Sequence, residues 1–170
     1  MNKKTIKLVL FLGIVSMISG LAIGAVNDIV SPIIAENDIK AEKANLELIF
    51  PGAEFSLVDY TDENGVVLAV YKAAGKGVIV KATGIGYSTS DPIIALFGFD
   101  TTGKCVDVKP LAQQETNGFG SKCFEEGNIK TLYVGKGLGD SADMIAGATL
   151  TSSAMRDMLA AAQTAFQEVQ

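Results

Sequence analysis

The residues best suited to chemistry in this chain are four hydroxyl side chains around a small turn, in the stretch AGATLTSS at 146–153. An apolar pattern with helical spacing follows directly, so the stretch is expected at a helix N-terminus. Such an end carries unpaired N–H groups and a partial positive charge, which together stabilise an anion such as a phosphate. Gly147 and Ala148 leave room for a ligand near the backbone, and Thr149 adds a hydroxyl. Taken alone, these residues favour the simpler alternative of a turn followed by a helix cap at Thr151, Ser152 or Ser153.

The element that must position this turn is the last helix, predicted from Ala154 to the end of the chain. Its apolar residues recur at intervals of three and four, which is typical of a helix with one buried face. They are Met155, Met158, Leu159, Ala162, Phe166 and Val169.

Several kinds of chemistry are not expected from the residue inventory. The sequence of 170 residues contains no histidine, so zinc hydrolysis and nucleophilic catalysis with a histidine base are not expected. No metal site and no residue that catalyses bond-making on a substrate is predicted. Whether the two cysteines, Cys105 and Cys123, form a disulfide is a question that the sequence leaves open.

The N-terminal region predicts a membrane anchor. Residues 8–26 contain 19 residues without a charge, which as a helix would extend roughly 28 Å, close to the thickness of a bilayer core. A cleaved signal peptide is the alternative. Lys3, Lys4 and Lys7 precede the apolar run, so residues 1–7 are expected in the cytoplasm and the rest outside it, in a single-pass protein of the cell membrane.

The segment after the predicted span is strongly acidic. Of the 14 basic residues only 11 follow Lys7, against all 19 acidic ones, which gives this part a net charge of −8. It should repel nucleic acid rather than bind it. Residues 27–52 are predicted to form a helical stalk, interrupted at Ser31-Pro32, because the residue before a proline disfavours the helical conformation.

Residues 53–170 are predicted to form one compact α+β domain. Four stretches rich in β-branched and aromatic residues read as strands of a mainly antiparallel sheet, at 66–73, 77–84, 92–100 and 104–111. The last two should form a hairpin with Gly103 in its turn. The tyrosines are expected to be half-buried sheet residues, unless one of them stacks near a ligand. They are Tyr60, Tyr71, Tyr87 and Tyr133.

Two motifs resemble a known family. The stretch DMIAGATLTS resembles the flavinylation motif of the FMN-binding domain found in the G subunit of Rnf ion-translocating electron-transport complexes and the C subunit of sodium-translocating NADH:quinone reductase. Its fixed positions fall on Asp143, Gly147, Ala148 and Thr149, while Ala146 replaces the usual Ser or Thr. The loop ETNGFG at 115–120 is similar to the family's Glu-Thr-Pro-Gly-x-Gly, with asparagine in place of proline.

The resemblance implies a cofactor and the residues that bind it. In the family, FMN is joined to the threonine of Gly-Ala-Thr through a phosphoester by a transferase that uses FAD, a role that falls on Thr149. The loop lies beside the flavin ring, which implies Glu115, Thr116 and Gly118 as flavin contacts. The remaining predicted cofactor-binding residues surround the acceptor: Gly147, Ala148, Leu150 and Thr151.

The resemblance also implies a function. The chain is expected to carry electrons as a flavoprotein subunit of a membrane complex that couples electron transfer to translocation of Na⁺ or H⁺, with the other subunits, the transferase and the membrane as partners. One alternative is a free-standing anchored flavoprotein for extracellular electron transfer. Another is a membrane-anchored binding module without redox activity, in which the Gly-Ala-Thr turn only caps a helix.

Overall fold

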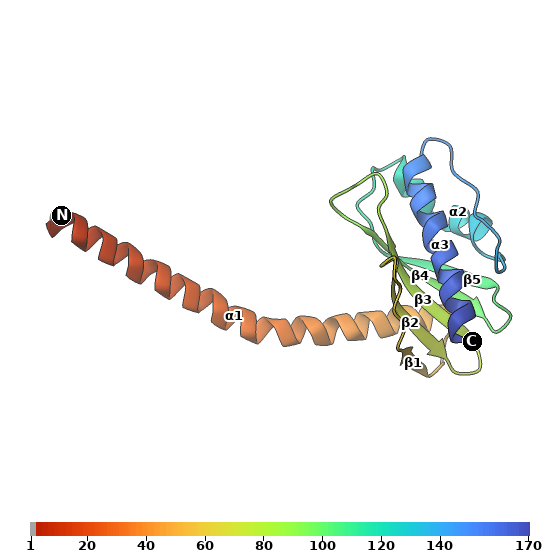
Figure 1. Ribbon diagram of the computed structural model, residues 1–170, viewed down its shortest axis with the longest axis horizontal. Helices are drawn as coiled ribbons and strands as arrows, with labels where there is room; N and C mark the ends of the chain where they lie inside the picture. The colour runs from red at the N-terminus through yellow and green to blue at the C-terminus, as the bar shows by residue number, and fades with distance from the viewer. Residues whose placement is uncertain (1–2) are drawn as a thin grey trace. The chain divides into compact units, whose positions relative to one another are not determined.

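The computed structural model describes residues 3–170, apart from the side chains at 3, 5, 6, 9, 22, 23 and 25–39. The chain divides into two compact units, Met1–Ala44 and Asn45–Gln170. Figure 1 shows the helices and strands with their labels. In chain order these elements are α1 (Lys3–Ile49), β1 (Phe55–Val58), β2 (Val67–Ala73), β3 (Gly77–Gly84), β4 (Ile93–Asp100), β5 (Cys105–Ala112), the 3-10 helix η1 (Gly120–Phe124), α2 (Glu126–Leu132) and α3 (Thr149–Val169).

The N-terminal helix α1 runs from Lys3 to Ile49 as one element. The interruption predicted at Ser31-Pro32 is therefore wrong. A proline inside a helix removes one backbone hydrogen bond, but the helix can continue beyond it.

Among the described residues, no helix has both the length and the hydropathy required to cross a bilayer. The span predicted over 8–26 includes undescribed side chains at 9, 22, 23, 25 and 26. It stays a prediction.

The second unit is built on a five-stranded antiparallel sheet in which each strand pairs with the next along the chain. The α+β class and the antiparallel sheet are confirmed. All four predicted strands are present, and the hairpin between β4 and β5 turns at Gly103, whose φ of 82° suits glycine. Strand β1 was not predicted from the sequence, because its four residues are too few to show a clear alternation.

Both faces of the sheet are covered, because successive side chains of a strand point to opposite faces and yet consecutive residues of β3 and β4 are buried. On one face, Val78 and Val80 of β3 belong to the core cluster formed with α3, and Figure 1 shows α3 lying across the sheet. On the other face, Ile79 packs with Leu46 and Ile49 from the end of α1. The last turns of α1 are thus part of the folded unit.

The last helix begins earlier than the sequence predicted. It starts at Thr149 rather than Ala154, and its N-cap residue is Ala148, which has no side chain able to cap. The cap predicted at Thr151, Ser152 or Ser153 is therefore wrong, since all three lie inside the helix. Apolar periodicity identified only the part of the helix that packs on the sheet, because polar residues occupy most of its first turn.

Both cysteines are free thiols, and both are buried. Burial raises the pKa of the Cys105 thiol to about 12, and burial also raises the pKa of Cys123. The disulfide that the sequence left open is therefore absent from the described structure.

Candidate functional site

A pocket of about 470 Å³ opens at the N-terminal end of α3. Three segments far apart in the sequence form it: the loop after β3, the loop before η1, and the turn that leads into α3. Its lining residues are Tyr87, Thr116, Phe119, Gly120, Gly147, Ala148, Thr149, Leu150 and Thr151. Its volume lies in the range of small-molecule sites.

The backbone at the start of α3 offers unpaired donors to this pocket. Ser152 is the first helical residue whose N–H bonds to a carbonyl, that of Ala148, at 2.8 Å. Within the described part of the chain, the N–H groups of Thr149, Leu150 and Thr151 have no acceptor. The helix α3, 21 residues long, begins here, and the N-terminal end of a helix carries a partial positive charge. A phosphate at this place would therefore be stabilised.

The turn before α3 is shaped by Gly147. Its φ of 81° lies in the left-handed region, which glycine adopts without strain. The Ala148 N–H closes the turn on the Ile145 carbonyl at 3.0 Å. From inside the helix, the buried hydroxyl of Ser152 accepts the Ile145 N–H at 3.1 Å and lies 3.3 Å from the Cys123 thiol. The turn is thereby held against the core.

Thr149 has the properties of an attachment point. It is exposed, it lines the pocket, and it is the first residue of α3. Among the described residues, no hydrogen bond engages its hydroxyl, so the oxygen can form a new bond without breaking an existing contact.

Thr151 lies two residues further on and also lines the pocket, but it differs from Thr149 in exposure and in hydrogen bonding. It is buried, with 1% of its surface exposed, and its hydroxyl donates to the Glu115 carboxylate at 2.5 Å. Glu115 is itself only 8% exposed and lies behind the pocket wall rather than in its lining.

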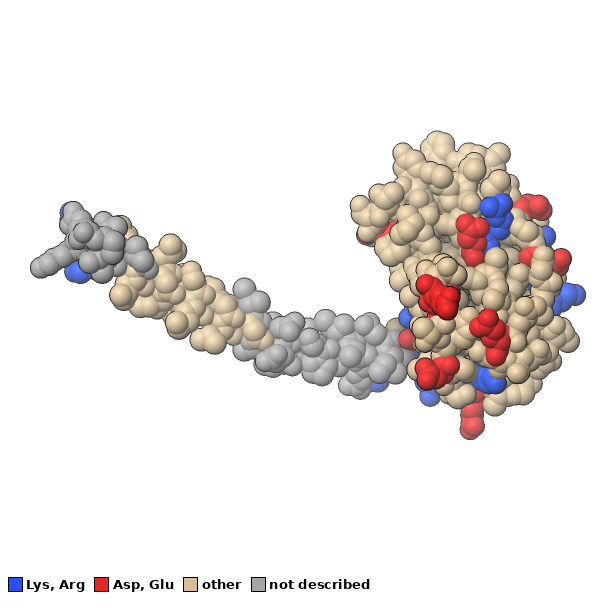
Figure 2. All heavy atoms as spheres, viewed as in Figure 1, with Lys and Arg blue, Asp and Glu red and all other residues tan. Residues whose placement is uncertain are grey.

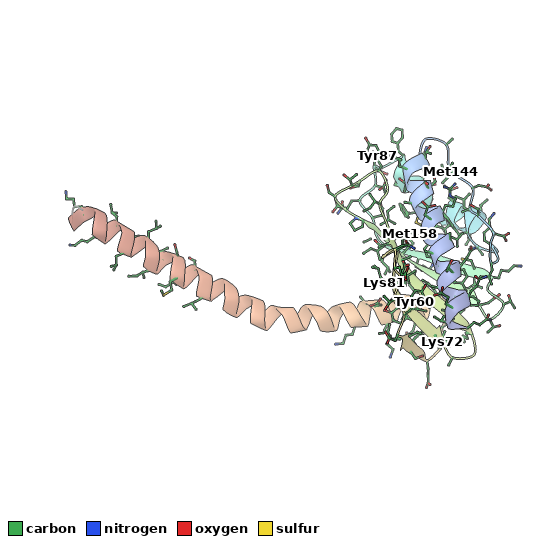
Figure 3. The ribbon with its side chains drawn as sticks, viewed as in Figure 1. Tyr60, Lys72, Lys81, Tyr87, Met144 and Met158 are labelled. Atoms are coloured by element: carbon green, nitrogen blue, oxygen red, sulfur yellow. The ribbon has the colours of Figure 1, made fainter. Side chains whose placement is uncertain are left out.

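The mouth of the pocket is apolar. Tyr87, Phe119 and Leu150 line the pocket and yet keep about 60% of their surface exposed, at 66%, 60% and 59%. Figure 3 shows Tyr87 and Met144 at the end of the domain where α3 begins, and on the face drawn in Figure 2 that end carries few charges. Aromatic and apolar side chains beside free N–H groups suit a ligand with a planar ring and a phosphate, as in FMN.

The pocket gathers most of the predicted cofactor-binding residues. Those in its lining are Thr116, Gly147, Ala148, Thr149, Leu150 and Thr151. Three predicted residues lie outside the lining. Glu115 is buried behind it, Asp143 is exposed, and Gly118 is in an exposed turn where its N–H donates to the Ser121 hydroxyl at 2.9 Å.

Three lining residues were not assigned from the sequence. Phe119 and Gly120 belong to the ETNGFG loop, whose resemblance contained the signal to find them. Tyr87 is exposed at the pocket mouth, while Tyr133 is fully buried and lies outside the sheet, so neither is the half-buried sheet residue expected. For Tyr87, the alternative of a tyrosine near the ligand is the one that the geometry favours.

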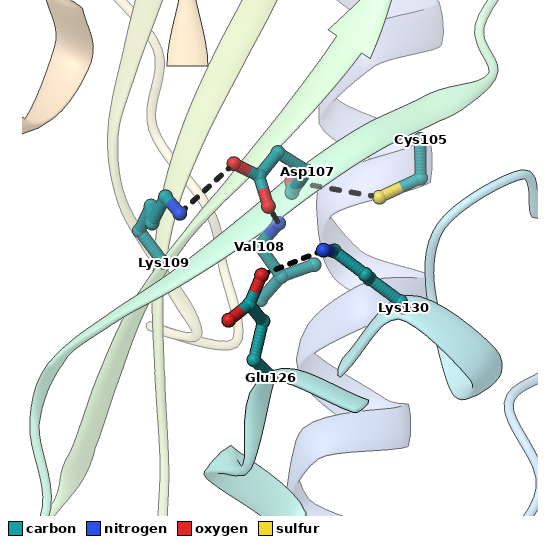
Figure 4. Close-up of polar contacts among 6 residues, drawn as sticks. All are labelled: Cys105, Asp107, Val108, Lys109, Glu126 and Lys130. Carbon is teal, nitrogen blue, oxygen red and sulfur yellow. Dashed lines mark hydrogen bonds and ion pairs between the residues drawn. The ribbon is translucent and has the colours of Figure 1, made fainter. Parts of the chain in front are cut away.

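A larger pocket, of about 730 Å³, lies between β5 and α2. Its charged side chains pair with each other. Lys109 bonds to Asp107 at 3.1 Å, and Lys130 bonds to Glu126 at 2.6 Å (Figure 4). Because these charges are already paired with each other, they are less available to bind a charged ligand.

The comparisons with known proteins agree with the geometry of the first pocket. The family model of the FMN-binding domain matches residues 86–164, a range that includes every residue lining that pocket. A comparison with curated proteins gives no match. The match and the pocket concern the same residues, so this part of the chain is similar to the FMN-binding domain.

Proposed function

We propose that the chain is an electron-carrying flavoprotein in which FMN is attached covalently to Thr149 through a phosphoester. One observation carries the proposal: Thr149 combines an exposed, unbonded hydroxyl with a place in the lining of the pocket and at the positive end of α3. The match to the FMN-binding domain supplies the cofactor.

Attachment would require only the threonine oxygen and a flavin transferase that uses FAD. Thr149 Oγ1 would form a bond to the phosphorus on the FMN side of FAD, the bond from that phosphorus to the AMP half would break, and the hydroxyl proton would be lost. The exposure of Thr149 supports access by such an enzyme. Ala146, which replaces the usual hydroxyl of the motif, is also exposed and leaves the acceptor unchanged.

Different residues of the pocket would then hold different parts of the cofactor. The N–H groups of Thr149, Leu150 and Thr151 would stabilise the negative phosphodiester. Tyr87 and Phe119 would flank the ring. The flavin supplies the ability to accept and donate electrons, and the protein supplies its position and surroundings.

The setting that we propose is a membrane complex similar to Rnf, in which this chain corresponds to the G subunit. A span over 8–26 would anchor the domain outside the cytoplasm, and polytopic partner subunits would carry Na⁺ or H⁺, since a single helix cannot form an ion path. The acidic balance of the chain supports partners other than nucleic acid. A free-standing anchored flavoprotein is the second candidate.

Mass spectrometry of the peptide containing Thr149 tests the attachment. In protein from cells that contain the transferase, we expect the mass of this peptide to rise by that of FMN less one water, and the Thr149→Ala variant should lack the addition. Thr151→Val is the matched control, because it removes a hydroxyl in the same turn and should keep the flavin. An unmodified peptide from such cells would favour the binding module instead.

Co-purification in mild detergent tests the setting. Isolation with polytopic and iron–sulfur subunits would support the ion-translocating complex, whereas isolation of the flavinylated chain alone would favour the free-standing carrier.

A further inference from the structure

The carboxylate of Glu115 has three donors from two sides of the pocket. Its Oε2 accepts the Thr151 hydroxyl at 2.5 Å and the Tyr87 N–H at 3.3 Å. Its Oε1 accepts the Ser88 N–H at 3.2 Å. The Thr151 bond is the shortest of the three.

The fold also leaves a space of matching size for this carboxylate. A Cβ placed on Gly86 would collide with Glu115 Oε1, and a Cβ on Gly120 would collide with both Glu115 Oε2 and the Thr151 hydroxyl. Both glycines have an ordinary backbone conformation, so local strain does not explain them. Glycine at these two positions makes room for the carboxylate.

These contacts join segments that are 27 to 36 residues apart along the chain. Tyr87 belongs to the loop after β3 and forms one side of the pocket mouth, while Thr151 belongs to the first turn of α3, which carries Thr149. The backbone hydrogen bonds of the sheet do not reach either segment. Packing of α3 on β3 and β4 brings the two sides together, and Glu115 adds direct hydrogen bonds between the loop and the first turn of α3.

We propose that Glu115 is a positioning residue for the flavin, which acts through Tyr87 and Thr151 without touching the ring. Its carboxylate joins the loop after β3 to the start of α3 through hydrogen bonds, and so helps to fix the walls between which the ring must fit. The effect on the flavin rests on the proposed function, while the link between the two walls does not.

Glu115→Gln is the most direct test, because glutamine has the same shape as glutamate but carries an NH₂ group, which donates hydrogen bonds, in place of one oxygen that accepts them. Whichever way the amide is oriented, its NH₂ must face the N–H of Tyr87 or Ser88, so at least one of these bonds is lost. Asp91→Asn is the matched control. It makes the same chemical change in the same loop, where the one partner of the Asp91 carboxylate among the described residues is the exposed Ser88 hydroxyl, at 3.4 Å.

The first measurement uses the full chain made without the transferase, so that flavin plays no part. Amide hydrogen exchange of peptides covering residues 84–91 should be about tenfold faster, or more, in Glu115→Gln and unchanged in Asp91→Asn. Thr151→Val alone should also accelerate exchange in this loop, and should add nothing once Glu115 is glutamine, because both changes act through one carboxylate. Wild-type exchange rates in Glu115→Gln would overturn the proposal.

The second measurement uses the flavinylated chain. A flavin ring held in fixed asymmetric surroundings gives circular dichroism in the visible range, and Glu115→Gln should weaken this signal while the far-ultraviolet spectrum stays that of a folded domain. A visible signal equal to that of wild type would show that the ring is positioned by other residues, which also overturns the proposal. If the wild-type chain carried no flavin, only the proposed function would be contradicted. The exchange experiment uses the chain without flavin, and it would still show whether Glu115 joins the loop after β3 to the start of α3.

Discussion

Thr149→Ala and Thr151→Val should have opposite consequences, although the two residues lie in the same helical turn. The first change should abolish covalent flavin and leave the stability of the domain unchanged. The second should keep the flavin and destabilise the fold. The contrast follows from burial and bonding, because Thr149 is exposed and unbonded within the described chain while Thr151 is buried and bonded to Glu115.

The magnitudes follow from these environments. Removing an exposed side chain without partners changes the free energy of unfolding by less than about 0.5 kcal/mol. Thr151→Val keeps the shape but removes a donor to a buried carboxylate, a loss of about 1.5–3 kcal/mol. For a unit the size of Asn45–Gln170 this lowers Tm by roughly 5–15 °C, against ~2 °C or less for Thr149→Ala.

The assay is thermal unfolding of the full chain, followed by near-ultraviolet circular dichroism, in protein made without the flavin transferase. This condition separates folding from any stabilisation by bound cofactor. Equal losses of Tm for both variants would refute the reasoning, because the Thr149 hydroxyl would then be a structural group and not a free acceptor.

Three further results are expected. Gly77→Ala should destabilise the domain by at least about 2 kcal/mol in urea unfolding, because its φ is 149° and its Cβ would meet a carbonyl oxygen of β4, whereas Gly75→Ala has open space and should cost only about 1–2 kcal/mol. The hydrogen bond from the Thr102 hydroxyl lowers the pKa of Asp100, so below about pH 4 the unfolded chain binds more protons than the folded chain. The free energy of unfolding should therefore fall as the pH falls through this range, and it should fall less steeply in the Asp100→Asn variant. Cys105, with a pKa of about 12, should resist alkylation at pH 8 in the native chain and react rapidly in denaturant, as followed by mass spectrometry.

The sheet could be predicted because its signals are local. Strands β2 to β5 contain runs of β-branched and aromatic residues between glycine-containing turns, and the hairpin at Gly103 needs a residue that tolerates a positive φ. The start of α3 could not be predicted in the same way. Its first turn is polar because it faces a pocket and a buried carboxylate, and hydrophobic periodicity carries no information about such surroundings.

The sequence by itself pointed to Thr149 as the hydroxyl that could accept a phosphate, because the adjacent residues Gly147, Ala148 and Thr149 resemble a family motif that can be read without the fold. Only the tertiary structure decided that Tyr87 lies at the pocket mouth and that Glu115 lies behind its wall. The physical reason is that burial and long-range hydrogen bonds arise when distant segments pack together. The loop motif singled out Glu115, but the hydrogen bonds of its carboxylate to Tyr87, Ser88 and Thr151 could not be predicted from any local pattern around position 115.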